Sequence, residues 1–97
     1  MAQIIDIEEY VANGKKVPIE IGTQYRVRVN CKTIVFPKKF VIAREILFAA
    51  GYDHEKSVLL AVYKGSHHPS QVGNNETIDI AGGVLRFIQL RSSWHSI

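Results

Sequence analysis

Cysteine is nearly missing from this sequence, because its 97 residues include only Cys31. A single cysteine excludes an internal disulfide framework and a zinc site built from several cysteines. Catalysis at Cys31 would need a neighbouring base that lowers the pKa of the thiol, and the sequence offers no such partner. We therefore expect Cys31 to lie in a turn without a chemical role.

Long apolar runs are missing as well. No stretch approaches the roughly 18 residues that cross a membrane, and the first ten residues are acidic rather than basic, unlike a signal peptide. We expect a cytoplasmic protein without a membrane partner. The length suits one domain, and 46% apolar with 22% charged residues argues against intrinsic disorder.

Clusters of functional side chains are equally scarce. The formal net charge is +3, but the basic residues are spread over several expected elements, whereas nucleic-acid binders usually gather them on one face. His67 and His68 are adjacent and would point to opposite sides of a strand, and no G-x-S-x-G nucleophile motif occurs. We therefore expect no nucleic-acid partner, no metal, no cofactor and no enzymatic activity.

The clearest periodic feature is an amphipathic helix predicted over residues 41–52. Ile42, Ile46 and Ala50 recur every four residues and form the centre of an apolar stripe. Gly51 follows, where helices often end in a left-handed residue. A single helix with one broad apolar face needs a sheet to pack against.

Strand patterns lie on both sides of this helix. Residues 25–29 alternate apolar and basic side chains, and residues 33–36 return after a turn at 30–32, which predicts a β-hairpin. Later strands are predicted at 58–63, 77–80 and 84–90, with a polar loop at 64–75 and a turn at Gly82-Gly83. One mixed sheet wrapped across the helix, with the last strand beside the first, accommodates this order. We therefore predict an α+β fold of the β-grasp type.

The sequence divides into three parts. Residues 1–22 form an N-terminal extension, in which Asp6 caps a short helix that ends near Asn13. The extension either packs on the main domain or orders only against a partner. Residues 23–91 form the β-grasp domain, and residues 92–97 form a C-terminal tail.

Several segments together carry a resemblance to a known family. They read Y-R-V-R-V-N at 25–30, F-V-I-A-R-E-I-L-F-A-A-G at 40–51, V-L-L-A-V-Y-K-G at 58–65, E-T-I-D-I at 76–80 and V-L-R-F-I-Q-L at 84–90, after a lead-in D-I-E-E-Y-V-A-N-G-K-K-V-P at 6–18. This set resembles the bacterial multi-ubiquitin family of ubiquitin-like domains. The resemblance implies a protein modifier that is attached to target proteins, possible participation in antiviral defence, and three enzyme partners. These are a ubiquitin-activating-like enzyme, a ubiquitin-conjugating-like enzyme and a processing protease.

The C-terminal residues depart from the pattern of such modifiers, which react through a terminal carboxylate that usually follows a glycine pair after the last strand. Here Gly82-Gly83 precede that strand, and residues 91–97 contain no glycine. Either a protease trims the tail and exposes a small residue, or the chain acts non-covalently as a self-associating scaffold. We assign tail processing or conjugation to Arg91, Ser92, Ser93 and Trp94.

The last strand also predicts a partner-binding surface. If Leu85 and Phe87 face the helix, Arg86, Ile88 and Leu90 face outward, and an apolar pair beside a basic residue resembles the sheet surface that ubiquitin offers its partners. The alternative is that Ile88 and Leu90 pack under the extension. Trp94 is costly to leave in water, so we expect it to dock on its own domain, on a neighbouring copy or on an enzyme.

Overall fold

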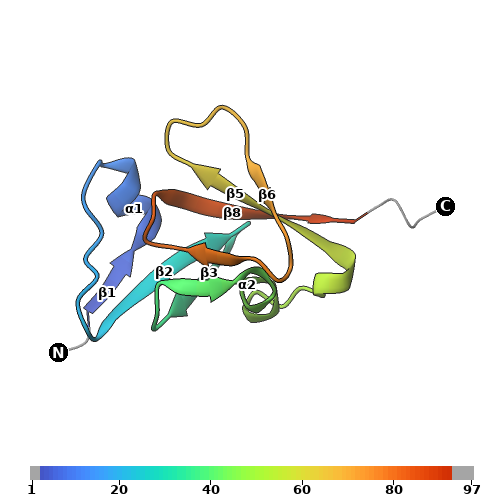
Figure 1. Cartoon of the computed structure of the whole chain (residues 1–97), viewed down its shortest axis with the longest axis horizontal. Coiled ribbons are helices and arrows are strands. Elements are labelled where there is room, and N and C mark those ends of the chain that lie inside the picture. Colours follow the sequence, from blue (N-terminus) through green and yellow to red (C-terminus); the bar gives the residue numbers. More distant parts are fainter. Residues whose placement is uncertain (1–2, 93–97) are drawn as a thin grey trace.

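The computed structural model describes residues 3–92 of the chain, and Ser93 and Trp94 lie outside the described residues. The described part is a small α+β structure in which a mixed sheet of several strands packs on one main helix (Figure 1). Among the described residues, the helices are all too short to cross a membrane.

The main sheet has its last strand in the middle. Its order is β1-β2-β8-β5-β6, with β3 on the other edge of β2. The strands are β1 (Gln3–Asp6), β2 (Thr23–Val29), β3 (Lys32–Phe36), β5 (Ser57–Tyr63), β6 (Ser70–Val72) and β8 (Val84–Arg91). Strand β8 runs parallel to β2 and antiparallel to β5. The prediction that the last strand lies beside the first strand of the hairpin is confirmed.

The predicted hairpin is present as β2 and β3, which pair antiparallel from Tyr25↔Phe36 to Val29↔Lys32. Its apolar positions on β2 are buried, whereas Arg26 and Arg28 lie on the opposite face, as the alternation indicates. Asn30 adopts a positive φ of 57° at the turn, a conformation that asparagine tolerates better than most residues.

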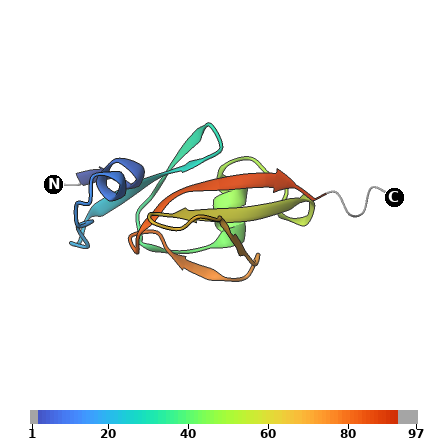
Figure 2. The ribbon, with the colours of Figure 1, turned by 90° about the horizontal axis from the view of Figure 1, so that it is seen from above.

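The main helix, α2 (Ala43–Ala49), lies on one face of the sheet and crosses behind β5 and β8 in Figure 2. The prediction of a helix from residue 41 is wrong at this end. Residues 40–42 instead form β4 (Phe40–Ile42), which pairs with β7 (Thr77–Asp79) in a separate two-stranded sheet. The N–H groups of Ala43 and Arg44 then bond to the carbonyls of Glu76 and Asn74, so the same distant segment holds the start of the helix.

The C-terminal end of α2 lies at the glycine that the sequence predicts to end it. The helix ends before Gly51, which adopts a positive φ of 85° and donates its N–H to the Phe48 carbonyl. A short 3-10 helix, η1 (His54–Lys56), then leads into β5.

Residues of the N-terminal extension pack on the same core as the rest of the chain. The extension contains β1 and then α1 (Ile7–Ala12), whose first turn is capped by Asp6 as predicted. Strand β3 occupies one edge of β2, so β1 and β8 share the other edge, at Thr23–Arg26 and at Val29 respectively. Since β8 occupies this edge beyond β1, the chain turns away from the sheet at Ile7 and forms α1, which contacts β8.

The core is one continuous cluster that every layer contributes to. Its fully buried members come from the extension, the inner sheet face, α2 and the β4–β7 pair, and include Ile5, Ile7, Val27, Val29, Val41, Ile46, Leu47, Leu59, Ile80, Val84 and Phe87.

A bulge in β8 changes which side chains face this core. Val62 pairs with Arg86, but Tyr63 pairs with Val84, so Leu85 is an extra residue in the ladder. Phe87 faces the core as predicted. Leu85, however, is only half-buried, because the bulge gives the fully buried position to Val84. The segment predicted as a polar loop at 64–75 likewise contains a short strand, β6, on the edge of β5.

Candidate functional site

The sheet surface opposite α2 carries the residues predicted to bind a partner. Strands β5 and β8 pair Val58 with Leu90, Leu60 with Ile88, and Val62 with Arg86. These six residues alternate with the buried pair Ala61 and Phe87, so they point away from α2. We call them the outer β5–β8 face: Val58, Leu60, Val62, Arg86, Ile88 and Leu90.

This face is apolar along most of its length, and its side chains are more exposed to solvent toward the C-terminal end of β8. Val58, Leu60, Val62 and Ile88 are half-buried, whereas Leu90 is 51% exposed. Arg86 lies near the opposite end, where its Nη1 is 3.4 Å from Glu8 Oε2 on α1. The structure thus brings Arg86, Ile88 and Leu90 to one surface, with the extension contacting it at Arg86.

Acidic side chains of the extension meet basic side chains of β2 and β8. Asp6 Oδ2 lies 3.2 Å from Arg28 Nη2 and 3.6 Å from Arg26 Nη1. Glu8 bridges Arg28, at 3.3 Å, and Arg86. Glu8 Oε1 is buried and makes only this charge contact to Arg28, without an aligned hydrogen bond among the described atoms. We call these five residues the extension ion cluster.

The protonation of Asp6 reflects this cluster. Partial burial by itself would raise the pKa of the carboxyl group. The Glu9 N–H, the hydrogen bond from Arg28 and the positive charges of Arg28 and Arg26 outweigh that effect and lower the pKa of Asp6. The carboxylate therefore stabilises the contact between the extension and the sheet.

A second contact holds the rest of the extension. The Tyr25 hydroxyl donates to the Pro18 carbonyl at 2.9 Å. Burial, followed by the nearby charge of Asp79, raises the pKa of Tyr25, so the phenol keeps its proton and remains a donor.

The residues assigned to the tail begin at the end of β8. Arg91 is exposed and pairs with Ser57 in the sheet, and the Ser92 N–H donates to the Lys56 carbonyl at 2.9 Å. Ser92 therefore extends the pairing between β8 and β5 by one bond, as far as the end of η1. Ser93 and Trp94, the other two assigned residues, lie outside the described part of the chain.

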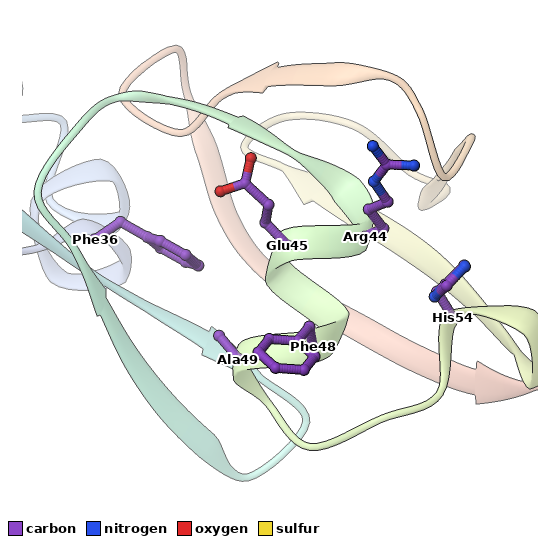
Figure 3. A pocket seen from close by; sticks show the side chains of 6 residues that line it. All are labelled: Phe36, Arg44, Glu45, Phe48, Ala49 and His54. Atoms are coloured by element: carbon purple, nitrogen blue, oxygen red, sulfur yellow. The ribbon is translucent and has the colours of Figure 1, made fainter.

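A groove of about 440 Å³ lies on the solvent side of α2. We call it the α2 groove, and Figure 3 shows its lining residues: Phe36, Arg44, Glu45, Phe48, Ala49 and His54. Phe36 points from the end of β3 toward the helix (Figure 3). Two of the charged groups are already engaged, because Arg44 Nη1 donates to Asn75 Oδ1 at 3.0 Å and Glu45 lies 3.4 Å from Lys38.

The α2 groove is the feature that sequence reasoning missed. Phe48 is 83% exposed although it lies in the middle of an apolar segment. The sequence did contain a sign of this exposure, because Phe48 falls outside the stripe formed by Ile42, Ile46 and Ala50 and should therefore face solvent. A large aromatic residue away from the buried stripe indicates a surface feature.

The isolated reactive side chains stay isolated in the fold. Cys31 is exposed in the hairpin turn, and His67 and His68 are exposed in the loop after β5. Within residues 3–92, no three His, Cys, Asp or Glu side chains gather as a metal site would require. No protein-family model, curated protein or solved structure matches this chain.

Proposed function

We propose that the chain is a ubiquitin-like β-grasp domain that acts in the cytoplasm as a protein modifier or its precursor. The observation that carries the proposal is the strand order β3-β2-β8-β5-β6 across a single main helix. The β2–β3 hairpin is followed by α2 and then by β5. The last strand, β8, lies between β2, to which it is parallel, and β5, to which it is antiparallel. Under this proposal the chain is the substrate of enzymes and has no activity of its own.

The outer β5–β8 face is the surface we assign to enzyme partners. It combines aliphatic side chains from two paired strands with a basic residue at one end, a mixture suited to a partner with an apolar centre and an acidic rim. The assigned partners are an activating enzyme, a conjugating enzyme and a protease of the ubiquitin type. Leu90 is the best exposed apolar member, so its contact should contribute most.

In this proposal the group that reacts is a carboxylate in the C-terminal tail. Strand β8 ends at Arg91 and is followed by Ser92, and proteolysis near Arg91–Trp94 would leave a carboxylate on a small residue at the end of the central strand. An activating enzyme of this class would first join the carboxyl group to an enzyme thiol as a thioester, at the expense of a nucleoside triphosphate that takes up the carboxylate oxygen. The target amine then attacks the thioester carbonyl, so that the C–N bond of the amide forms, the C–S bond breaks and the enzyme thiol leaves.

The test is to express the chain with enzymes of these three classes and to measure intact masses. A shortened chain together with adducts on other proteins is the expected result. A Leu90→Arg variant should lose adducts while remaining folded, whereas Phe40→Ser, an exposed position on β4 away from this face, should keep them. Recovery of only the intact chain ending at Ile97, with no adducts, would sink the conjugation proposal.

A non-covalent scaffold is the second candidate, and exposed isoleucines in the extension favour it. Ile4 is half exposed, Ile19 is 63% exposed and Ile21 is fully exposed, all within one segment. Several large apolar side chains exposed in one segment favour a contact with another copy of the chain. Light scattering should then show an oligomer that Ile19→Ser with Ile21→Ser reduces to a monomer. A wild-type chain that stays monomeric at high concentration contradicts this candidate.

A further inference from the structure

One turn of the extension holds two large apolar side chains in water. Residues 19–22, which we call the isoleucine turn, carry Ile19, which is 63% exposed, and Ile21, which is fully exposed. Single exposed apolar residues are common on protein surfaces, but two within three residues form a small apolar protrusion. The isoleucine turn is therefore a surface that gains from being covered.

This turn is held in place at both ends. The Thr23 N–H donates to the Glu20 carbonyl at 3.1 Å, and Gly22 has a φ of 89°, as the third residue of a type II turn requires. On the other side, the Tyr25 hydroxyl holds the Pro18 carbonyl at 2.9 Å. The isoleucines are thus ordered before any partner binds, which lowers the entropic cost of binding.

The α2 groove is an apolar surface that the described residues leave open. Phe36 and Ala49 line it, and Phe48, another lining residue, is 83% exposed (Figure 3). An isoleucine side chain has no polar atom, so it needs no hydrogen-bond partner when it is buried between such residues. The groove therefore suits the kind of side chain that the isoleucine turn presents.

The charges beside these two features have opposite sign. Glu20 is exposed and forms no ion pair within residues 3–92. The groove is lined by two exposed basic side chains, Arg44 and His54. Its one acidic lining residue, Glu45, already lies 3.4 Å from Lys38. A carboxylate brought to the groove therefore meets a positive rim, and this complementarity favours one orientation of the contact.

The turn and the groove lie apart in a single chain. The isoleucine turn directly precedes β2, which begins near one end of the long axis, whereas α2 lies farther along this axis in both views (Figures 1 and 2). The full exposure of Ile21 also means that it does not fill the groove of its own chain. An isoleucine turn that fills the groove must belong to another copy.

We propose that the isoleucine turn of one copy inserts Ile21 into the α2 groove of a second copy, with Glu20 beside Arg44. The two surfaces differ, so each copy in such a pair keeps one free turn or one free groove. Further copies then join head to tail. This inference rests on the scaffold candidate, in which the exposed isoleucines contact another copy, and it names the surface that receives them.

Light scattering on the purified chain over a concentration series tests the contact. Wild type should form species that grow beyond a dimer, whereas Ile21→Ser, which removes the inserted side chain, should stay monomeric. Phe48→Ser removes a wall of the groove, Ala49→Arg fills it, and both should also stay monomeric. All three residues are exposed, so the variants should keep the wild-type circular dichroism spectrum. Phe40→Ser, an exposed phenylalanine outside the groove, is the matched control and should assemble like wild type.

Mixing two monomeric variants tests whether the turn and the groove bind each other. Ile21→Ser keeps an intact groove and Phe48→Ser keeps an intact turn, so their equimolar mixture should form a dimer of twice the monomer mass and no larger species. A mixture that stays monomeric overturns the proposal.

The remaining outcomes separate this inference from the proposals on which it builds. Oligomers that Ile21→Ser abolishes, but that Phe48→Ser and Ala49→Arg leave intact, overturn the groove as the receiving surface and retain the scaffold candidate. A wild-type chain that is monomeric throughout the series overturns both. No conjugating enzyme is present in these measurements, so none of the outcomes depends on the modifier function.

Discussion

The backbone N–H of Gln89 donates to the side-chain Oδ1 of Asn30 at 2.9 Å, so a side chain continues the ladder between β2 and β8 after β2 has ended. The Asn30 backbone N–H bonds to the Phe87 carbonyl, and its Nδ2 reaches the Tyr52 hydroxyl at 3.1 Å. Gln89 in turn donates to Ser57 Oγ on β5. One turn residue thereby joins the hairpin, the central strand and the segment after α2.

Replacing Asn30 with glycine should destabilise the fold by about 1–2 kcal/mol, because glycine keeps the positive φ but leaves the Gln89 N–H without its acceptor. Asn30→Asp retains an acceptor oxygen and should lose less. Urea denaturation followed by circular dichroism measures both values. Equal stabilities for glycine and wild type would show that the side-chain contact contributes nothing.

Ile46→Asp should unfold the chain. Ile46 is fully buried at the centre of the α2 stripe, and a carboxylate there would have no partner to offset its lost hydration. Phe48→Asp, two residues along the same helix, is the control and should remain folded because Phe48 faces solvent. The measurement is thermal denaturation, and a cooperative transition near the wild-type temperature in Ile46→Asp contradicts the prediction.

Local patterns predicted the hairpin, the apolar stripe of α2 and the outward orientation of Arg86, Ile88 and Leu90 on β8. These features depend on side-chain periods of 2 and 3.6 within one segment, which are visible in the sequence. Arg26 and Arg28, for example, alternate with buried neighbours along β2. The pairing of Val58 with Leu90 was not predicted, because it depends on which strand lies beside β8.

Features that depend on distant partners could not be predicted in this way. Strand β4 exists because β7, more than thirty residues later, offers it a free edge, and its three residues are too few to show a period. The β8 bulge shifts Val84 into the core through its pairing with β5, without a local signal. The α2 groove likewise depends on how β3 and η1 flank the helix.

Gly51→Ala should lower the free energy of unfolding by about 1 kcal/mol, because an alanine is strained at a φ of +85°. Steric room is not the obstacle, since a Cβ there would lie 3.4 Å from Nζ of Lys32, an ordinary van der Waals contact. For a chain of this size the loss corresponds to a fall in Tm of about 4–8 °C. Gly73→Ala, where φ is not positive and the nearest contact is 3.8 Å, is the control. A Tm for Gly51→Ala no lower than that of Gly73→Ala would contradict the role of the left-handed residue.

The extension ion cluster predicts a pH-dependent stability that can be assigned to Asp6. Its pKa is lowered in the folded state by the Glu9 N–H and the two arginines against the effect of burial, so the carboxylate stabilises the fold above the unfolded pKa of about 4. That contribution is lost as the pH falls through the lower, folded pKa. Asp6→Asn keeps an N-cap but removes the charge, so it should be less stable than wild type by about 1 kcal/mol at neutral pH.

The difference between wild type and Asp6→Asn should therefore shrink as the pH falls from about 5 toward 2, and it should be smaller at high salt. Urea denaturation across this range measures it. Glu20→Gln removes an exposed carboxylate that forms no ion pair within residues 3–92, and it should change stability less at neutral pH. A difference for Asp6→Asn that persists or grows at the acidic end would mean that its charge does not hold the extension to the sheet.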